Sequence, residues 1–95
     1  MRSLLGESRG KFEIKNKLGM HARAAAVFVK TALQYSSDIE VAKKGHKVSG
    51  KSIMSVLQLA AVQGDVIEVI AQGDDSREAL SAIGALVAEL FGEEE

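Results

Sequence analysis

Several residue types are missing or scarce in this chain of 95 residues. Cysteine is absent, which excludes disulfide bonds, thiolate metal ligands and cysteine nucleophiles. Proline and tryptophan are absent too. The four aromatic residues are Phe12, Phe28, Tyr35 and Phe91. The longest uninterrupted apolar run, residues 24–29, is far shorter than the ~20 residues that a membrane span needs. The apolar stretch that follows Arg2 consists only of Leu4 and Leu5, which is too short for a signal-peptide core. We therefore expect a cytoplasmic protein with no membrane insertion.

The composition is that of a folded domain: 46% of the residues are hydrophobic and 26% are charged. The net charge of −1 hides an asymmetry. Residues 1–51 contain 11 Lys/Arg and 4 Asp/Glu, a balance of +7, whereas residues 52–95 contain one Lys/Arg and 9 Asp/Glu, a balance of −8. Such a bias can give a dipolar surface that steers a partner, or it can reflect only the charges that solvent-exposed faces happen to carry.

Hydrophobic periodicity predicts seven elements. Alternating or β-branched apolar residues predict strands at residues 11–16, 39–43, 46–49 and 66–71. Apolar residues at helical spacing predict helices at residues 21–35, 52–62 and 79–90. We expect Gly64 to cap the second helix, Asp75 or Ser76 to begin the third, and 66–71 to be the central strand.

The order β-α-β-β-α-β-α predicts an α+β fold. Alternating strands leave one face of a sheet wet, so three helices must cover the other face of a four-stranded, mostly antiparallel sheet. This is a two-layer open-faced sandwich. We expect one domain over residues 10–92, a flexible leader at 1–9 and a solvated acidic tail at 93–95.

His21 is the first candidate for chemistry because it stands where the first helical stripe begins, in the place of a usual N-cap residue. The unpaired N–H groups of a helix start bind anions and disfavour a charged imidazole. Arg23 follows within the first turn, and its guanidinium matches phosphate oxygens. Together these groups suit a phosphoryl group carried on His21. Taken alone, a histidine at a loop–helix junction is more often plain polar surface.

Ser52 is the second candidate. Serine is a preferred N-cap, which explains the residue without any further role. A phosphate on the same side chain would also be tolerated, because negative charge is favourable at a helix start. Met54 lies off the apolar stripe of this helix, so we expect it to be exposed and suited to an adaptable docking patch.

No other constellation of catalytic residues is present. The sequence has no glycine-rich phosphate loop, Ser-His-Asp arrangement or metal-ligand spacing around His46, so we expect neither a cofactor nor a metal ion. The strands offer only Phe12 as an aromatic, on the apolar face, which argues against nucleic-acid binding. His21 and Arg23 alone cannot complete a reaction cycle. We therefore expect a carrier or binding module rather than a stand-alone enzyme.

Two segments resemble signatures of the histidine-containing phosphocarrier (HPr) family of the bacterial sugar phosphotransferase system. Residues 16–25, NKLGMHARAA, are similar to the active-site signature N-x-x-G-[LIM]-H-[AT]-R-P-A. Residues 51–57, KSIMSVL, are similar to the regulatory-serine signature. The resemblance spans roughly residues 10–92, and the predicted element order agrees with it.

The resemblance implies a relay. His21 would accept a phosphoryl group on Nδ1 from phosphorylated enzyme I, supplied by phosphoenolpyruvate, and pass it to enzyme IIA of a sugar permease. Arg23 would hold the phosphate oxygens. Ser52 would be phosphorylated by HPr kinase/phosphorylase. Met20, Ile53 and Met54 would contribute to the docking surface of a monomer.

Ala24 departs from the family pattern, which has proline after the arginine. Proline in a first helical turn fixes φ and removes an N–H, so Ala24 loosens this turn and returns one donor to it. The departure leaves a second interpretation open: an HPr-like signalling module whose main role is to bind a transcriptional regulator after phosphorylation of Ser52. Such modules lack the active histidine, whereas this chain has His21.

Overall fold

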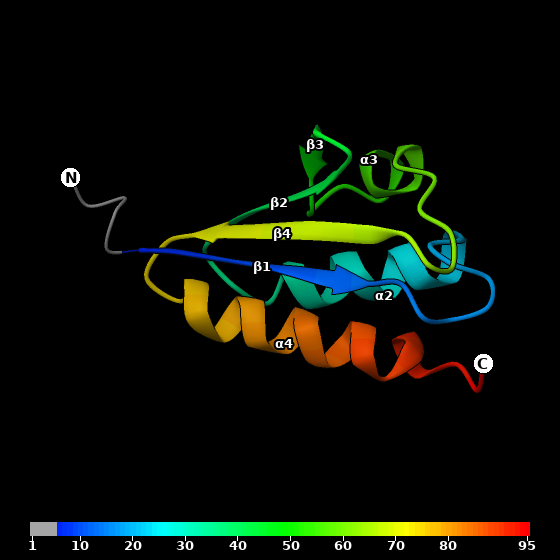
Figure 1. Ribbon diagram of the computed structural model, residues 1–95. Coiled ribbons are helices and arrows are strands. Elements are labelled where there is room, and N and C mark those ends of the chain that lie inside the picture. The colour runs from blue at the N-terminus through cyan, green and yellow to red at the C-terminus, as the bar shows by residue number, and fades with distance from the viewer. Residues whose placement is uncertain (1–5) are drawn as a thin grey trace.

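The computed structural model describes residues 6–95, which form a two-layer α+β sandwich (Figure 1). Its elements are β1 (Glu7–Glu13), α2 (Ala22–Ala32), β2 (Asp38–Lys43), β3 (His46–Ser49), α3 (Ile53–Gln58), β4 (Val66–Gln72), α4 (Ser76–Ala88) and a final 3₁₀ turn, η1 (Leu90–Gly92). The strands form one sheet in the order β1-β4-β2-β3, and all neighbours are antiparallel. The predicted fold class is confirmed.

β4 is the central strand of the sheet, as its β-branched sequence predicts. It pairs with β1 on one side, where Phe12 lies opposite Ile67, and with β2 on the other, where Val41 lies opposite Val69. Ile67, Val69 and Val41 are fully buried. Cross-strand pairs of this kind are the main stabilising unit of a sheet.

The helices form the second layer. α2 and α4 pack against each other and run across the sheet, and α3 packs against α2 (Figure 1). The apolar stripes of the two longer helices face the sheet and bury Phe28 and Ile83 completely. Burial of one such side chain contributes ~1.5–3 kcal/mol. None of the helices within residues 6–95 has the length and hydropathy to cross a bilayer.

β1 begins earlier than predicted. Residues 7–10 belong to the strand because they pair in register with residues 69–72 of β4, and their burial alternates like that of the rest of β1. The predicted leader is therefore wrong over residues 7–9, while residues 1–5 lie outside the described part of the chain. Beyond Glu13, Ile14 remains buried, and its N–H donates to the Asp65 carbonyl at 2.8 Å.

α3 ends four residues before the predicted end at residue 62. Its C-cap is Leu59, and Ala60 has a left-handed φ of 51°, so Gly64 does not cap this helix. After the helix, Ala60 O accepts from Lys43 Nζ at 3.0 Å, and Ala61 O accepts from Met20 N at 2.9 Å. These contacts tie the end of α3 to β2 and to the loop before α2.

Asp75 is the N-cap of α4 by position, in agreement with one of the two predicted starts. Its side chain does not cap the helix. The carboxylate instead accepts from the N–H groups of Ser36 and Ser37 and from the Ser37 hydroxyl, and these hydrogen bonds lower the pKa of Asp75 to about 2. Asp75 thus holds the loop between α2 and β2 against the start of α4.

Candidate functional site

His21 occupies the N-cap of α2. Its backbone is extended, with φ −80° and ψ −178°, and its carbonyl accepts the first helical hydrogen bond from Ala25 N at 2.9 Å. The imidazole forms no capping hydrogen bond, so no side chain closes the first turn. A helix start of this kind presents unpaired N–H groups and a partial positive charge. The position predicted for His21 is confirmed.

The loop before α2 is held in one conformation by its own hydrogen bonds. Asn16 is fully buried, and its Nδ2 donates to the Gly19 carbonyl at 2.8 Å while Gly19 N donates back to the Asn16 carbonyl at 3.1 Å. Gly19 has a φ of +67°, and a Cβ there would lie 2.7 Å from the Ala61 carbonyl oxygen. Only glycine fits this position without displacing the backbone. The loop thereby delivers His21 to the helix start.

Glu93 is part of this site, although the sequence places it in a solvated acidic tail. Its Oε2 lies 2.5 Å from His21 Nε2, and its Oε1 accepts from Asn16 Nδ2 at 2.9 Å. The Glu93 side chain is only 11% exposed and that of His21 is 27% exposed. The prediction of a solvated tail is therefore wrong for Glu93.

The electrostatics of Glu93 favour the ionised carboxylate. Burial raises the pKa of the Glu93 carboxyl, but the hydrogen bonds from His21 and Asn16 outweigh this effect, and the pKa lies below its ordinary value. The charge of Arg23 lowers the pKa further. Since an ionised carboxylate can only accept hydrogen bonds, His21 Nε2 carries the proton. In the neutral ring, the second nitrogen, Nδ1, then keeps its lone pair.

Arg23 is the second residue of α2, and its side chain is exposed. Its charge reaches the site, since it contributes to the low pKa of Glu93. The structure thus brings together His21, Arg23 and the open helix start, as predicted from their spacing. An exposed guanidinium in the first turn of the same helix can bind the oxygens of a phosphoryl group.

Ser52 is the N-cap of α3, as predicted. Its backbone is extended and its Oγ accepts a hydrogen bond from Ser55 N at 3.3 Å. The side chain therefore caps its own helix, and the capping role explains the serine without any modification. Ser52 is half-buried, so its hydroxyl is not fully shielded from solvent.

Two of the three predicted docking residues lie on the surface. Ile53 is 42% exposed and Met54 is 69% exposed, large values for apolar side chains, and Leu18 is exposed as well. Met20 is only 4% exposed and belongs to the hydrophobic core. The prediction that Met20 contributes to a docking surface is therefore wrong. Its N–H is bonded to the Ala61 carbonyl, which turns the side chain of this loop residue into the interior.

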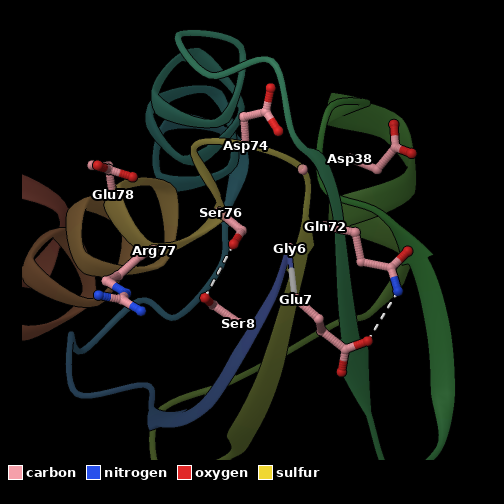
Figure 2. Close-up of a pocket in the computed structure, with 10 residues that line it drawn as sticks. Gly6, Glu7, Ser8, Asp38, Gln72, Asp74, Ser76, Arg77 and Glu78 are labelled. Atoms are coloured by element: carbon pink, nitrogen blue, oxygen red, sulfur yellow. Dashed lines mark hydrogen bonds between the residues drawn. The ribbon is translucent and has the colours of Figure 1, made fainter. Parts of the chain in front are cut away.

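A separate pocket lies at the opposite end of the molecule, where β1 begins and β4 leads into α4 (Figure 2). Four of its polar side chains bind one another in pairs: the Ser8 and Ser76 hydroxyls lie 3.1 Å apart, and Gln72 Nε2 donates to Glu7 at 2.9 Å. Within residues 6–95, no three side chains of metal-ligating type come together.

Known proteins match this chain over most of its length. The profile of the family described as "PTS HPr component phosphorylation site", PTS being the phosphotransferase system, matches residues 8–89. The chain belongs to the HPr family. The resemblance to this family, carried by two short signatures, is thereby confirmed over residues 8–89.

The relatives include both phosphocarrier proteins HPr and HPr-like proteins Crh. The phosphocarrier protein HPr of Neisseria meningitidis is 48% identical over 83 residues, which cover 87% of this chain and 93% of that protein. The HPr-like protein Crh of Bacillus subtilis is 44% identical over 79 residues, 83% of this chain and 93% of Crh. The crystal structure of an HPr from Thermoanaerobacter tengcongensis superimposes with a TM-score of 0.89 at 48% identity, covering 93% of this chain and 99% of that one.

Proposed function

We propose that this member of the HPr family relays a phosphoryl group through His21. Phosphorylated enzyme I, charged from phosphoenolpyruvate, is the donor, and enzyme IIA of a sugar permease is the acceptor. The observation that carries the proposal is the placement of an imidazole with a free Nδ1 at an uncapped helix start. Membership of a phosphocarrier family supports the same chemistry. We place this relay in the cytoplasm and assign it to a monomer.

The transfer is a displacement at phosphorus. The Nδ1 lone pair of His21 forms the new P–N bond while the bond between phosphorus and the donor atom of enzyme I breaks, and the electron pair of that bond returns to the donor. Arg23 and the first-turn N–H groups of α2 stabilise the charge on the phosphoryl oxygens. The reverse displacement delivers the group to enzyme IIA. No residue of this chain needs to act as acid or base, which explains the small number of residues at the site.

Recognition of enzyme I rests on charge and on exposed apolar side chains. Residues 1–51 carry an excess of positive charge, which suits an acidic face on the partner. Ile53 and Met54, exposed at the start of α3, supply the apolar contact. Ser52 immediately precedes them. Its phosphorylation by the ATP-dependent HPr kinase/phosphorylase would place negative charge beside that contact and weaken docking of an acidic partner.

A regulatory module is the second candidate function. The 44% identity to Crh favours it, as does Ala24 in place of the family proline. In that case the phosphorylated Ser52 surface would bind a transcriptional regulator, and His21 would carry no phosphoryl group. The presence of both His21 and Arg23 at the start of α2 favours the carrier.

The deciding experiment is incubation with phosphoenolpyruvate and enzyme I, followed by mass spectrometry. We expect the mass to increase by one phosphoryl group, in an adduct that is labile in acid and stable in base, as a phosphoramidate is. His21→Ala should abolish the adduct. His46→Ala is the matched control, since His46 is the only other histidine and is exposed on β3. An adduct that persists in His21→Ala, or its absence from the unaltered chain, would rule out the relay through His21.

A further inference from the structure

The C-terminal residues form a strap across the loop that carries His21. We define this strap as Glu93–Glu95. Glu93 contacts His21 and Asn16 as described, and the Glu95 carbonyl accepts from Lys17 N at 2.8 Å. The Lys17 ammonium and the Glu95 carboxylate form a further ion pair at 3.6 Å. Figure 1 shows the C-terminus at the same end of the molecule as the start of α2. Residues more than 70 positions apart therefore share one site.

The backbone after α4 directs the strap toward the site. Leu90 and Phe91 both have left-handed φ values, 62° and 55°, which turn the chain back at the end of the helix. Phe91 is buried and belongs to the hydrophobic core. Left-handed residues other than glycine are strained, so this turn must be held by its packing. The buried Phe91 side chain supplies that packing and anchors the chain two positions before Glu93.

Asn16 fixes the orientation of the Glu93 carboxylate. One side chain amide nitrogen donates to two acceptors, Gly19 O and Glu93 Oε1, whereas its Oδ1 has no hydrogen-bond partner among residues 6–95. A flipped amide would bring its oxygen against two other oxygens, so the observed orientation is the only favourable one. In this orientation the buried Asn16 Oδ1 has no partner among residues 6–95, while Nδ2 holds the Glu93 carboxylate toward His21 Nε2.

We propose that Glu93 is a positioning residue for phosphoryl transfer: its carboxylate keeps the proton of His21 on Nε2, so that Nδ1 is the nucleophilic nitrogen throughout the relay. This inference rests on the proposed function of His21. When Nδ1 takes the phosphoryl group and the Nε2 proton stays in place, the ring becomes positively charged. The carboxylate 2.5 Å away compensates that charge, and no proton leaves the site. A carboxylate that orients a histidine in this way is a recurring arrangement in catalysis.

The tautomer of His21 in the unphosphorylated protein gives a direct test that requires no enzyme. We expect ¹⁵N NMR at a pH where the ring is neutral to show the Nε2–H form in the unaltered chain. Glu93→Ala should give a mixture of the two tautomers, because neither ring nitrogen then has the preferred acceptor. Glu94→Gln is the matched control. Glu94 is the neighbouring glutamate and is exposed, so its substitution should leave the tautomer unchanged.

The rate of phosphorylation by enzyme I gives the second readout. A hydrogen bond to a charged group is worth enough for Glu93→Ala to slow transfer about tenfold, with no such change in Glu94→Gln. Glu93→Gln separates the contributions, because it keeps an acceptor oxygen and removes the charge. We expect it to preserve the tautomer and to slow transfer by less than Glu93→Ala. Amide NMR spectra of β4 in each variant establish that the fold is intact.

The outcomes separate this inference from the proposed function. An unchanged tautomer and an unchanged rate in a folded Glu93→Ala variant would overturn the positioning role, while phosphorylation of His21 would still stand. A mixed tautomer already present in the unaltered chain would overturn it as well. If the unaltered chain shows the Nε2–H form but accepts no phosphoryl group from enzyme I, the relay itself is wrong.

Discussion

Two helices of this protein begin in opposite ways: the N-terminus of one lacks a side-chain cap, and that of the other is capped by its own N-cap residue. α2 begins at His21, whose side chain turns away from the helix and binds Glu93, so the first-turn N–H groups have no side-chain acceptor. α3 begins at Ser52, whose hydroxyl accepts from Ser55 N and closes the turn. Both N-cap residues have extended backbones. Only the side-chain chemistry distinguishes the two starts.

An open helix start has an energetic cost that a protein of this size would normally avoid. A capping residue is worth ~1 kcal/mol, and α2 forgoes it. The position of Arg23 in the same turn adds a second unfavourable term, since a cation there opposes the helix dipole. Both terms become favourable once a phosphoryl group binds. A bound anion would therefore stabilise the start of α2, whereas the start of α3 is already stabilised by its own Ser52 hydroxyl.

The open start depends most on Arg23. Arg23→Lys should slow transfer from enzyme I about tenfold, because an ammonium cannot reproduce the paired hydrogen bonds that a guanidinium makes with phosphate oxygens. Rapid-quench measurement of phospho-His21 formation checks this. Arg77→Lys is the matched control: Arg77 is likewise the second residue of its helix, α4, but lines the pocket at the opposite end of the molecule. Equal rates for both variants would leave Arg23 as an ordinary surface charge.

The closed start depends on the oxygen of Ser52. Ser52→Ala should lower the free energy of unfolding by about 1 kcal/mol because Ser55 N loses its acceptor, whereas Ser52→Asp should cost little since aspartate caps well. Urea denaturation checks both values. Ser81→Ala, on an exposed position within α4, is the control and should not destabilise the protein.

Ser52→Asp also tests whether the two helix starts communicate. Its negative charge beside Ile53 and Met54 should reduce phosphorylation of His21 at low salt, and added salt should shrink the difference. If this variant accepts phosphate from enzyme I as fast as the unaltered chain at low salt, the proposed effect of serine phosphorylation on docking is wrong.

Local patterns predicted the fold and both helix starts. The alternation around β4, the helical stripes and the residues at the N-caps all act over a few positions, so they can be read along the chain. His21, Arg23 and Ser52 occupy the expected places for the same reason. The end of α3 was mispredicted because the chain leaves the helix at Ala60, which has a left-handed φ, and the segment after the helix binds Lys43 and Met20, which are remote in sequence.

Long-range contacts account for what the sequence analysis missed at the site. Glu93 sits in a run of three glutamates, whose composition indicates a solvated tail. Only Phe91 indicates otherwise: it adds an apolar residue directly after the predicted helical stripe, which ends at Leu90, and so favours a chain that folds back. Met20 gives no such hint, because burial of a loop methionine depends on the end of α3 that lies over it.

Ala24 offers the finest test of the open helix start. It is the third residue of α2 and is fully buried, and its N–H lies in the first turn, where no helical carbonyl is available. Ala24→Pro should therefore raise the free energy of unfolding by about 0.4–1 kcal/mol, since proline restricts the unfolded chain. Ala26→Pro, beyond the first turn, should instead destabilise by about 3 kcal/mol. Thermal unfolding of both variants measures the contrast.

The phosphorylated form of the same variant tells whether the Ala24 N–H binds the phosphoryl group. If it does, Ala24→Pro removes one donor from the anion site, and phospho-His21 should hydrolyse faster even though the unphosphorylated protein is more stable. The decay rate of phospho-His21, compared with that of the unaltered chain, measures this effect. A stabilised variant with an unchanged decay rate would show that the N–H of Ala24 takes no part, and the open start would then act through Ala22 and Arg23 alone. A destabilised unphosphorylated protein would contradict the unpaired state of that N–H, on which the comparison of the two helix starts depends.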